Sequence, residues 1–294
     1  MRMKNKWYKN YLYLVPSMLI IMVFQIIPLF KVFAMGFYTK FNYVTDEVYE
    51  VGIDNFINVL QDENFYIAIK NTFTYVILSV PLSIILALIV AVNINKIKRL
   101  KGFFTSVYFI PFVTASVAIS VVWRWIFHSE YGVLNVIINF LGYESQGFLL
   151  DEKWTMPMLV FLNIWKGLGY KTLIILAGLQ NIDERYYNAA RIDGAGKFMI
   201  FRKITIPMLT PTLFFLVITS TISSIKIFDE IFVLYDKQPG PLKSALTIVY
   251  YVFDKFYMKW QFASASAAAF ILFVIIAIFS IIQFRIGRRF DYYE

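Results

Sequence analysis

Hydroxyl side chains crowd one apolar segment of this chain, residues 206–227. The residues there that we predict to line a solute path are Thr219, Ser220, Ser223, Ser224 and Lys226. Hydroxyls both donate and accept hydrogen bonds, so this pattern favours reversible recognition of a polyhydroxylated solute. Ser and Thr also bond to the carbonyls of their own helix or to neighbouring helices, and that packing interpretation is the alternative.

The sequence lacks the residues that covalent catalysis and metal binding require. The sequence has no cysteine and a single histidine, His128, so it holds no disulfide, no thiolate or His-based metal cluster and no Ser-His-Asp triad. It also has no P-loop, because Gly196-Lys197 is followed by Phe198 and has no Gly five residues before it. We therefore expect a non-catalytic chain that binds no metal or cofactor and takes any energy from a partner or an ion gradient.

A polar stretch, residues 180–211, interrupts the apolar second half and carries both signs of charge. It predicts a short amphipathic helix with Asp183 as N-cap, Glu184 in the first turn and Arg191 near the other end. Gly194 falls where a left-handed C-terminal cap is expected. A helix of about ten residues is only about 15 Å long, too short to span a bilayer but suited to a groove on another protein.

This stretch resembles the EAA loop of binding-protein-dependent ABC importer permeases, whose pattern is E-A-A-x3-G-x9-I-x-L-P. The positions that fall on that pattern without a gap are Asn188, Ala189, Ala190, Gly194, Ile204, Ile206 and Pro207. Asn188 replaces the Glu and Ile206 replaces the Leu. The surrounding sequence, ARIDGAG and ITIPML, is similar to that of the sugar permeases of the maltose and glycerol-3-phosphate type.

The resemblance implies a type I importer permease fold and a cytoplasmic coupling loop, residues 180–205, that binds a separate ATPase. The coupling residues that it implies are Glu184, Asn188, Ala189, Ala190, Asp193, Gly194, Gly196, Ile204, Ile206 and Pro207. Asn offers only neutral hydrogen bonds at position 188, so we hypothesise that Glu184, one turn earlier, replaces the family's Glu. A charge reversal of Glu184 that left ATPase coupling intact would exclude this hypothesis.

Two further stretches are similar to the same family. NIWKGLGYKTLIILAGLQNI, residues 163–182, resembles the family's fourth span, and FDEIFVLY, residues 228–235, resembles the segment after its fifth span. The family often continues with T-x-G-G-P, whereas here residues 236–241 read DKQPGP, so the outer loop departs from the pattern. Within the spans, we expect Asn71, Asn163 and Lys166 to be packing or interfacial groups.

The composition indicates a membrane protein, with 59% hydrophobic and 16% charged residues over 294 positions. A soluble protein of this size cannot bury so much apolar surface. We predict an all-α polytopic membrane protein that forms one permease domain, residues 1–294. Its six transmembrane helices are expected at residues 11–37, 66–92, 103–127, 156–179, 206–227 and 263–284.

Charge sets the predicted orientation. The net charge is +9, and the basic residues lie in short segments between apolar spans rather than in the single patch of a nucleic-acid binder. Placing both termini, the turn at 96–102 and the loop at 180–205 on one side gives that side more than half of the 28 Lys and Arg residues. By the positive-inside rule this side is cytoplasmic. The resemblance implies that the membrane is a bacterial cytoplasmic membrane.

The resemblance implies a permease subunit for a sugar, oligosaccharide or related polyol. Its expected partners are a second homologous permease, two copies of an ABC ATPase that holds ATP and Mg, and an extracytoplasmic solute-binding protein; a homodimer is the alternative to the heterodimer. One rival is a permease for glycerol-3-phosphate or another anionic solute, for which Lys226 is the candidate cation. Another is an ion-driven secondary transporter, which would call for acidic residues at mid-span.

Overall fold

The structure is a computed structural model and describes residues 7–42, 45, 47–97 and 99–287, with side chains from position 11 onward except that of residue 12. The orientation argument also counts basic residues that lie outside the described residues: those of the N-terminus up to Lys6, Lys98, Arg288 and Arg289. The chain forms two compact units: residues 1–62 with 251–273, and residues 63–250 with 274–294. Helix α14 (Phe262–Gly287) begins in the first and ends in the second.

The first unit starts with α1 (Trp7–Ile21), a π-helical turn η1 (Met22–Ile26) and α2 (Ile27–Gly36). An antiparallel hairpin of β1 (Tyr38–Asn42) and β2 (Glu47–Val51) follows, then α3 (Asp54–Gln61). The unit closes with η4 (Asp254–Met258) and the first half of α14. Aromatic rings form its core, with Phe270 centred 4.9 Å from Phe33 and 5.7 Å from Phe56.

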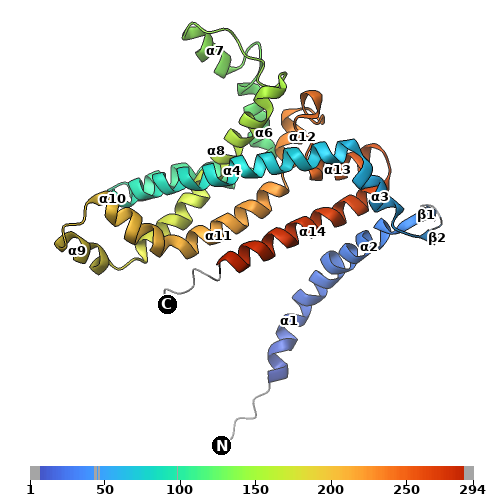
Figure 1. Ribbon diagram of the computed structural model, residues 1–294, viewed down its shortest axis with the longest axis horizontal. Helices are drawn as coiled ribbons and strands as arrows, with labels where there is room; N and C mark the ends of the chain where they lie inside the picture. The colour runs from blue at the N-terminus through green and yellow to red at the C-terminus, as the bar shows by residue number, and fades with distance from the viewer. Residues whose placement is uncertain (1–6, 43–44, 46, 98, 288–294) are drawn as a thin grey trace, which may run out of the picture. The chain divides into compact units, whose positions relative to one another are not determined.

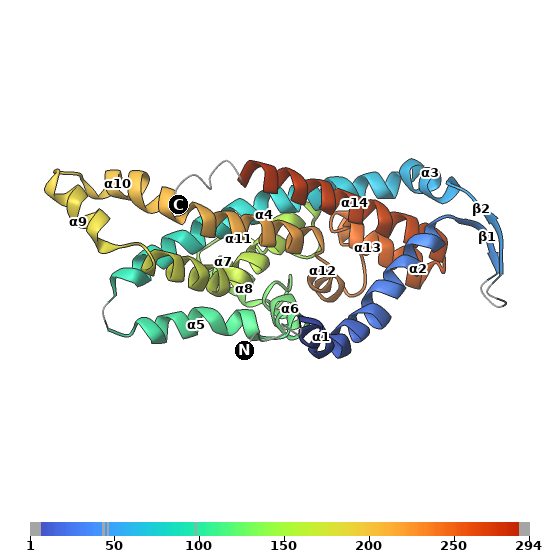
Figure 2. The same cartoon turned by 90° about the horizontal axis from the view of Figure 1, so that it is seen from below.

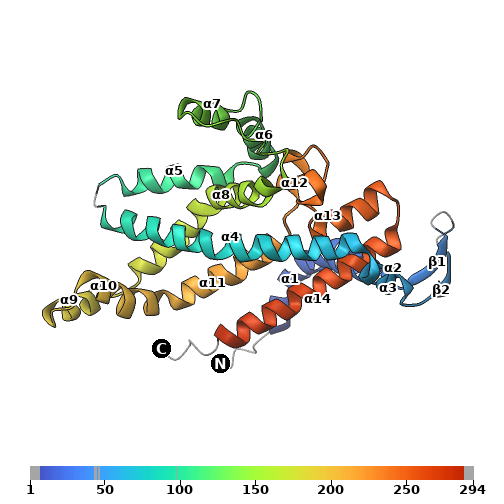
Figure 3. The same cartoon turned by 45° about the horizontal axis from the view of Figure 1, so that its top comes forward.

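The second unit is built on three long helices, α4 (Glu63–Lys96), α8 (Glu152–Gln180) and α11 (Ile206–Ile225). They pack against one another and run side by side in Figures 1 and 3. Buried residues recur every three to four positions along α4, and many are small, including Ala68, Ala87 and Ala91. Small side chains allow close helix packing where lipid supplies no hydrophobic driving force between helices.

The expected third span is broken into α5 (Lys101–Val113) and α6 (Ser116–Ile126), which meet at a bend of 95°. Pro111 lies near the end of α5, where its ring removes a backbone donor, and the helix stops two residues later. Thr114 and Ala115 then take extended conformations. Helix α5 still packs on α8 (Figure 2), and a side chain at Gly169 would collide with the carbonyl oxygen of Tyr108.

Helices α9, α10 and α12 lie at the two ends of these long helices. Helix α9 (Glu184–Ile192) and helix α10 (Lys197–Ile200) lie at one end (Figure 1). Helix α12 (Asp229–Leu234) lies at the other end. The other described elements are α7 (Val133–Phe140), η3 (Pro241–Lys243) and α13 (Ile248–Phe253). Within the described residues, five helices have the length and apolarity to cross a membrane, and the bent pair α5–α6 makes a sixth.

Candidate functional site

Helix α9 begins as the sequence predicts. The Asp183 carboxylate accepts a 2.8 Å hydrogen bond from the backbone N–H of Arg185, which satisfies one of the free donors of the first turn. The Arg185 guanidinium returns to the same carboxylate, with Nε 2.7 Å from Oδ2. These hydrogen bonds and the positive charge of Arg185 lower the pKa of Asp183 below its ordinary value, so the cap is ionised at neutral pH.

Helix α9 ends at Gly194, which has the predicted left-handed conformation with φ of 80°. The N–H of Ala195 donates to the carbonyl of Ala190 at 2.9 Å, and the N–H of Gly194 donates to the carbonyl of Arg191 at 3.1 Å. This pair of bonds is a Schellman motif, which reverses the chain direction after the helix.

The chain then runs without a break from α10 through a π-helical turn, η2 (Phe201–Thr205), into α11. The sequence places the start of the span at Ile206, but the helix that contains it already begins at Lys197. Pro207 cannot donate a backbone hydrogen bond, and its ring crowds the carbonyl four residues before it. The wide turn relieves this crowding, because the N–H of Ile206 bonds five residues back, to the carbonyl of Phe201. Helix α10 is therefore joined to α11 by continuous helix.

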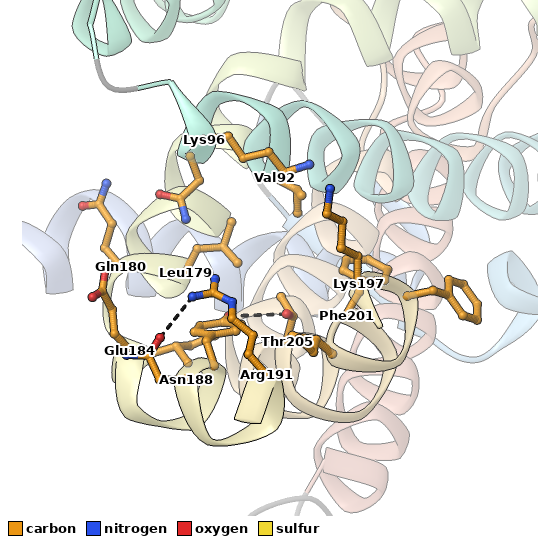
Figure 4. A pocket seen from close by; sticks show the side chains of 15 residues that line it. Val92, Lys96, Leu179, Gln180, Glu184, Asn188, Arg191, Lys197, Phe201 and Thr205 are labelled. Carbon is orange, nitrogen blue, oxygen red and sulfur yellow. Dashed lines mark hydrogen bonds between the residues drawn. The ribbon is translucent and has the colours of Figure 1, made fainter. Parts of the chain in front are cut away.

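A groove of about 780 Å³ separates α9 and α10 from the ends of α4 and α8 (Figure 4). Glu184, Asn188 and Arg191 line it from α9, with Lys197 from α10 and Lys96 from α4. The amide oxygen of Asn188 accepts a 3.0 Å hydrogen bond from Nη1 of Arg191. Glu184 and Asn188 thus face the same groove, as the replacement hypothesis requires, and that hypothesis stays a prediction.

The other proposed coupling residues do not line this groove. They are Ala189, Ala190, Asp193, Gly194, Gly196, Ile204, Ile206 and Pro207. Ala189 is exposed, and Ala190 and Ile206 are half-buried. The loop therefore presents one face to the groove, and of its two alanines only Ala189 is exposed.

A second cavity, of about 200 Å³, lies among α5, α8, α11 and α12. It brings together four of the five predicted path residues, Thr219, Ser220, Ser223 and Ser224. Lys226 does not line it and is exposed at the end of α11.

The hydroxyls of this cavity divide between the two roles that the sequence left open. Thr219 donates to the carbonyl of Phe215 in its own helix at 2.9 Å, and Ser224 accepts from Ser79 of α4 at 3.3 Å. Ser220 and Ser223 make no side-chain hydrogen bond to another residue that the structure describes. Those two hydroxyls therefore do not fit the packing interpretation, and solute binding by them stays a prediction.

Helix α8 supplies further cavity residues, and the sequence analysis expected two of them, Asn163 and Lys166, to be packing or interfacial groups. Asn163, Lys166, Tyr170 and Lys171 all line the cavity, and the Tyr170 ring stacks on Phe112 of α5 with centroids 4.7 Å apart. Asn163, Lys166 and Tyr170 are spaced by three and four residues, and Lys171 follows the cavity residue Gly167 by four, which puts all of them on one face of the helix. This periodicity was the signal that could have identified them.

Lys166 is the centre of a polar cluster in this cavity. Its ammonium lies 3.0 Å from Oε1 of Glu230 in α12, and both side chains are less than one-fifth exposed. It also donates a hydrogen bond to the Ser116 hydroxyl, at the first residue of α6. The cluster therefore joins the bent third span, α8 and α12.

The chain has clear relatives. Residues 71–292 match the family model described as "Binding-protein-dependent transport system inner membrane component". The lactose transport system permease protein LacF of Rhizobium radiobacter is 32% identical, over 95% of this chain and 94% of its own length. The arabinooligosaccharides transport system permease protein AraP of Bacillus subtilis is 31% identical, over 95% and 88% respectively.

Solved structures agree on the fold. A chain in the crystal structure of a bacterial ABC transporter that imports the acidic polysaccharide alginate superposes with a TM-score of 0.85 at 24% identity, covering 96% of both chains. A chain of the alginate transporter in complex with an alginate pentasaccharide-bound periplasmic protein superposes with a TM-score of 0.86 at 24% identity, over 96% of this chain and 94% of that one. The predicted type I importer permease fold is thereby confirmed.

Proposed function

This chain belongs to the family of binding-protein-dependent transport system inner membrane components, and from that premise we propose that it is the permease subunit of an ATP-driven importer for a sugar, an oligosaccharide or a related polyol. It is a multi-pass membrane protein. Relatives named for lactose and arabinooligosaccharide transport support the solute class, as does the trehalose/maltose permease MalF of Thermococcus litoralis, 28% identical over 95% of this chain.

The observation that best supports a sugar or polyol as the solute is the composition of the cavity among α5, α8, α11 and α12. The Ser220 and Ser223 hydroxyls and the Asn163 amide offer donors and acceptors, beside the stacked rings of Tyr170 and Phe112. Most of the side chains that line the cavity are polar, and the two aromatic rings supply its apolar part. A sugar presents hydroxyls around a ring with apolar faces, which matches both parts of this lining.

The energy for uphill transport must reach this cavity from outside the chain, since the sequence has no P-loop. In our proposal a separate ATPase, which holds ATP and Mg, binds the coupling loop at α9 and the groove behind it. The continuous helix from Lys197 to Ile225 leads from that loop to the hydroxyls of the cavity. A rigid-body movement of α9 and α10 would be transmitted along this helix and open the cavity alternately to each side.

The same proposal assigns the partners. A second homologous permease would complete the path, and an extracytoplasmic binding protein would deliver the solute. The family description names dependence on a binding protein, and one structural neighbour was crystallised with its periplasmic protein. Exposed apolar residues on α5 and α6, such as Ile110, Val121 and Trp125, offer surface to lipid or to the second permease.

The test is purification of the tagged chain from its native membrane in mild detergent, followed by mass spectrometry of the proteins that accompany it. We expect a second permease and a P-loop ATPase, both missing from a parallel preparation with the untagged chain. Repeated recovery of a stable chain without an ATPase would contradict the proposal. It would favour an ion-driven secondary transporter, the alternative from another class.

A further inference from the structure

One cation in the cavity has no compensating charge. Lys171 of α8 is only 8% exposed and lines the cavity. Unlike Lys166, whose ammonium is 3.0 Å from Glu230, it forms no ion pair or hydrogen bond with any residue that the structure describes. A buried ammonium in the interior of a membrane protein is costly, and such groups normally pair or face a substrate path.

The backbone makes room for this ammonium. Gly167 lies one turn before Lys171 on α8, and a methyl group built on Gly167 would lie 2.8 Å from Nζ of Lys171. The long side chain thus runs back along its own helix, in the direction that helical geometry favours, and its charge rests over the glycine. Gly167 itself lines the cavity, so the ammonium is placed at the wall that a solute would touch.

The charged residues that line the cavity are Lys166, Lys171 and Glu230. Lys166 and Glu230 neutralise each other, which leaves one positive charge at Lys171. A single carboxylate would balance it, whereas a phosphate monoester carries about −1.5 to −2 at neutral pH and would leave an excess of negative charge. A neutral sugar would leave the ammonium desolvated and unpaired.

We propose that the solute of this transporter is an acidic saccharide, a sugar that bears one carboxylate at the position where it meets Lys171, and that Lys171 is the residue that selects it. This inference rests on the proposed importer function and narrows its solute class. The Ser220 and Ser223 hydroxyls would bind the sugar hydroxyls, while the Lys171 ammonium would form a charge-assisted hydrogen bond with the carboxylate. Lys226, the cation that the sequence suggested for an anionic solute, is exposed and outside the cavity.

The experiment uses the assembled transporter in proteoliposomes, with its binding protein, and measures uptake of matched sugar pairs. The probes are 1,4-linked disaccharides with a single carboxylate, in which one unit is glucuronate, galacturonate or mannuronate and the other is the neutral sugar of the same configuration. Each is measured beside its fully neutral counterpart built from glucose, galactose or mannose. The variants are Lys171→Met, which removes the charge at similar length, and Lys171→Arg, which keeps it. Lys70→Met is the matched control, because Lys70 is exposed on α4 and outside the cavity.

We expect uptake of the acidic member of at least one pair. Lys171→Met should lower kcat/KM for that acidic dimer by about tenfold or more, which is the usual effect of losing a hydrogen bond to a charged group. Uptake of the neutral counterpart should be unchanged or higher. Lys171→Arg should retain most of the acid uptake, and Lys70→Met should behave as wild type. The ratio of acidic to neutral uptake is the decisive quantity, because a residue with a merely structural role would lower both.

Three results would overturn the inference. Uptake of neutral dimers alone would refute the acidic solute and leave the sugar importer standing. An equal loss of both members of a pair in Lys171→Met would make Lys171 structural, as would be the case if a partner subunit supplied its counter-charge. Absence of uptake for every saccharide would remove the proposed function along with the inference.

Discussion

Gly194 ends α9 with a φ of 80°, a conformation that glycine adopts without penalty and a β-branched residue resists. The two backbone bonds of the turn depend on this conformation, since they place the N–H groups of Gly194 and Ala195 under the last carbonyls of the helix. There is open space around the α-carbon, with no atom within 4 Å of a built methyl group. Any effect of a larger residue there must therefore come from the backbone rather than from a collision.

Gly194→Val should leave the protein in the membrane but impair transport. A left-handed conformation costs an L-residue roughly 1–2 kcal/mol. This cost would shift the equilibrium between the native turn after α9 and other conformations of the chain by roughly 5- to 30-fold. The measurement is ATP-dependent uptake per unit of transporter in membrane vesicles. Wild-type uptake by this variant would show that the bend after α9 is not needed for coupling.

Gly142 provides a matched control. Its φ is 86°, and it too has no atom within 4 Å of a built methyl group, but it lies in the loop after α7 rather than beside α9. Gly142→Val should introduce comparable backbone strain and leave uptake near wild type. Equal loss in both variants would mean that strain acts on the whole protein and not through the coupling loop.

At the scale of helices, the ion pair between Lys166 and Glu230 is the contact that holds separate elements in one arrangement. It joins the middle of α8 to the first turn of α12, and the Ser116 hydroxyl adds the first turn of α6. Both charged side chains are less than one-fifth exposed, so neither can recover much hydration if the other is removed.

Single substitutions of this pair should destabilise the protein more than the double substitution does. Glu230→Gln leaves an ammonium buried without a counter-charge, at a cost of roughly 3 kcal/mol, whereas Lys166→Met with Glu230→Gln removes both charges. The readout is the free energy of unfolding in detergent across a double-mutant cycle. Additive losses would show that the two side chains act independently and that the pair does not join the helices.

At the scale of the whole chain, the orientation in the membrane is a prediction from charge alone. The sequence contains no cysteine, so single cysteines can be introduced without a background of native thiols. Ile192, at the end of α9, is 86% exposed, and Tyr143, after α7, is 71% exposed. The two residues are expected on opposite sides of the membrane.

In intact cells a membrane-impermeant maleimide should label Tyr143→Cys and not Ile192→Cys. After permeabilisation it should label both, which controls for the reactivity of each thiol. The reverse pattern would place the loop at α9 outside the cell, beyond reach of a cytoplasmic ATPase. It would contradict the coupling proposal together with the orientation.

The sequence by itself determined the class of the protein and the local geometry of the coupling loop. The apolar composition required a bilayer, and the spacing from Asn188 to Pro207 indicated the family that the comparisons confirm. The Asp183 cap and the Gly194 turn were also predicted correctly, because a helix end is fixed by residues within about one turn of it.

Only the tertiary structure decided which side chains share the cavity among α5, α8, α11 and α12. Phe112, Lys171 and Glu230 lie far apart in the sequence, and their meeting depends on how α5, α8, α11 and α12 pack and on the 95° bend in the third span. Periodicity assigns a residue to a face of its helix but does not say what that face meets. For that reason the sequence indicated Lys226 as the candidate cation, whereas the packing of the helices puts Lys166 and Lys171 in the cavity and leaves Lys226 outside it.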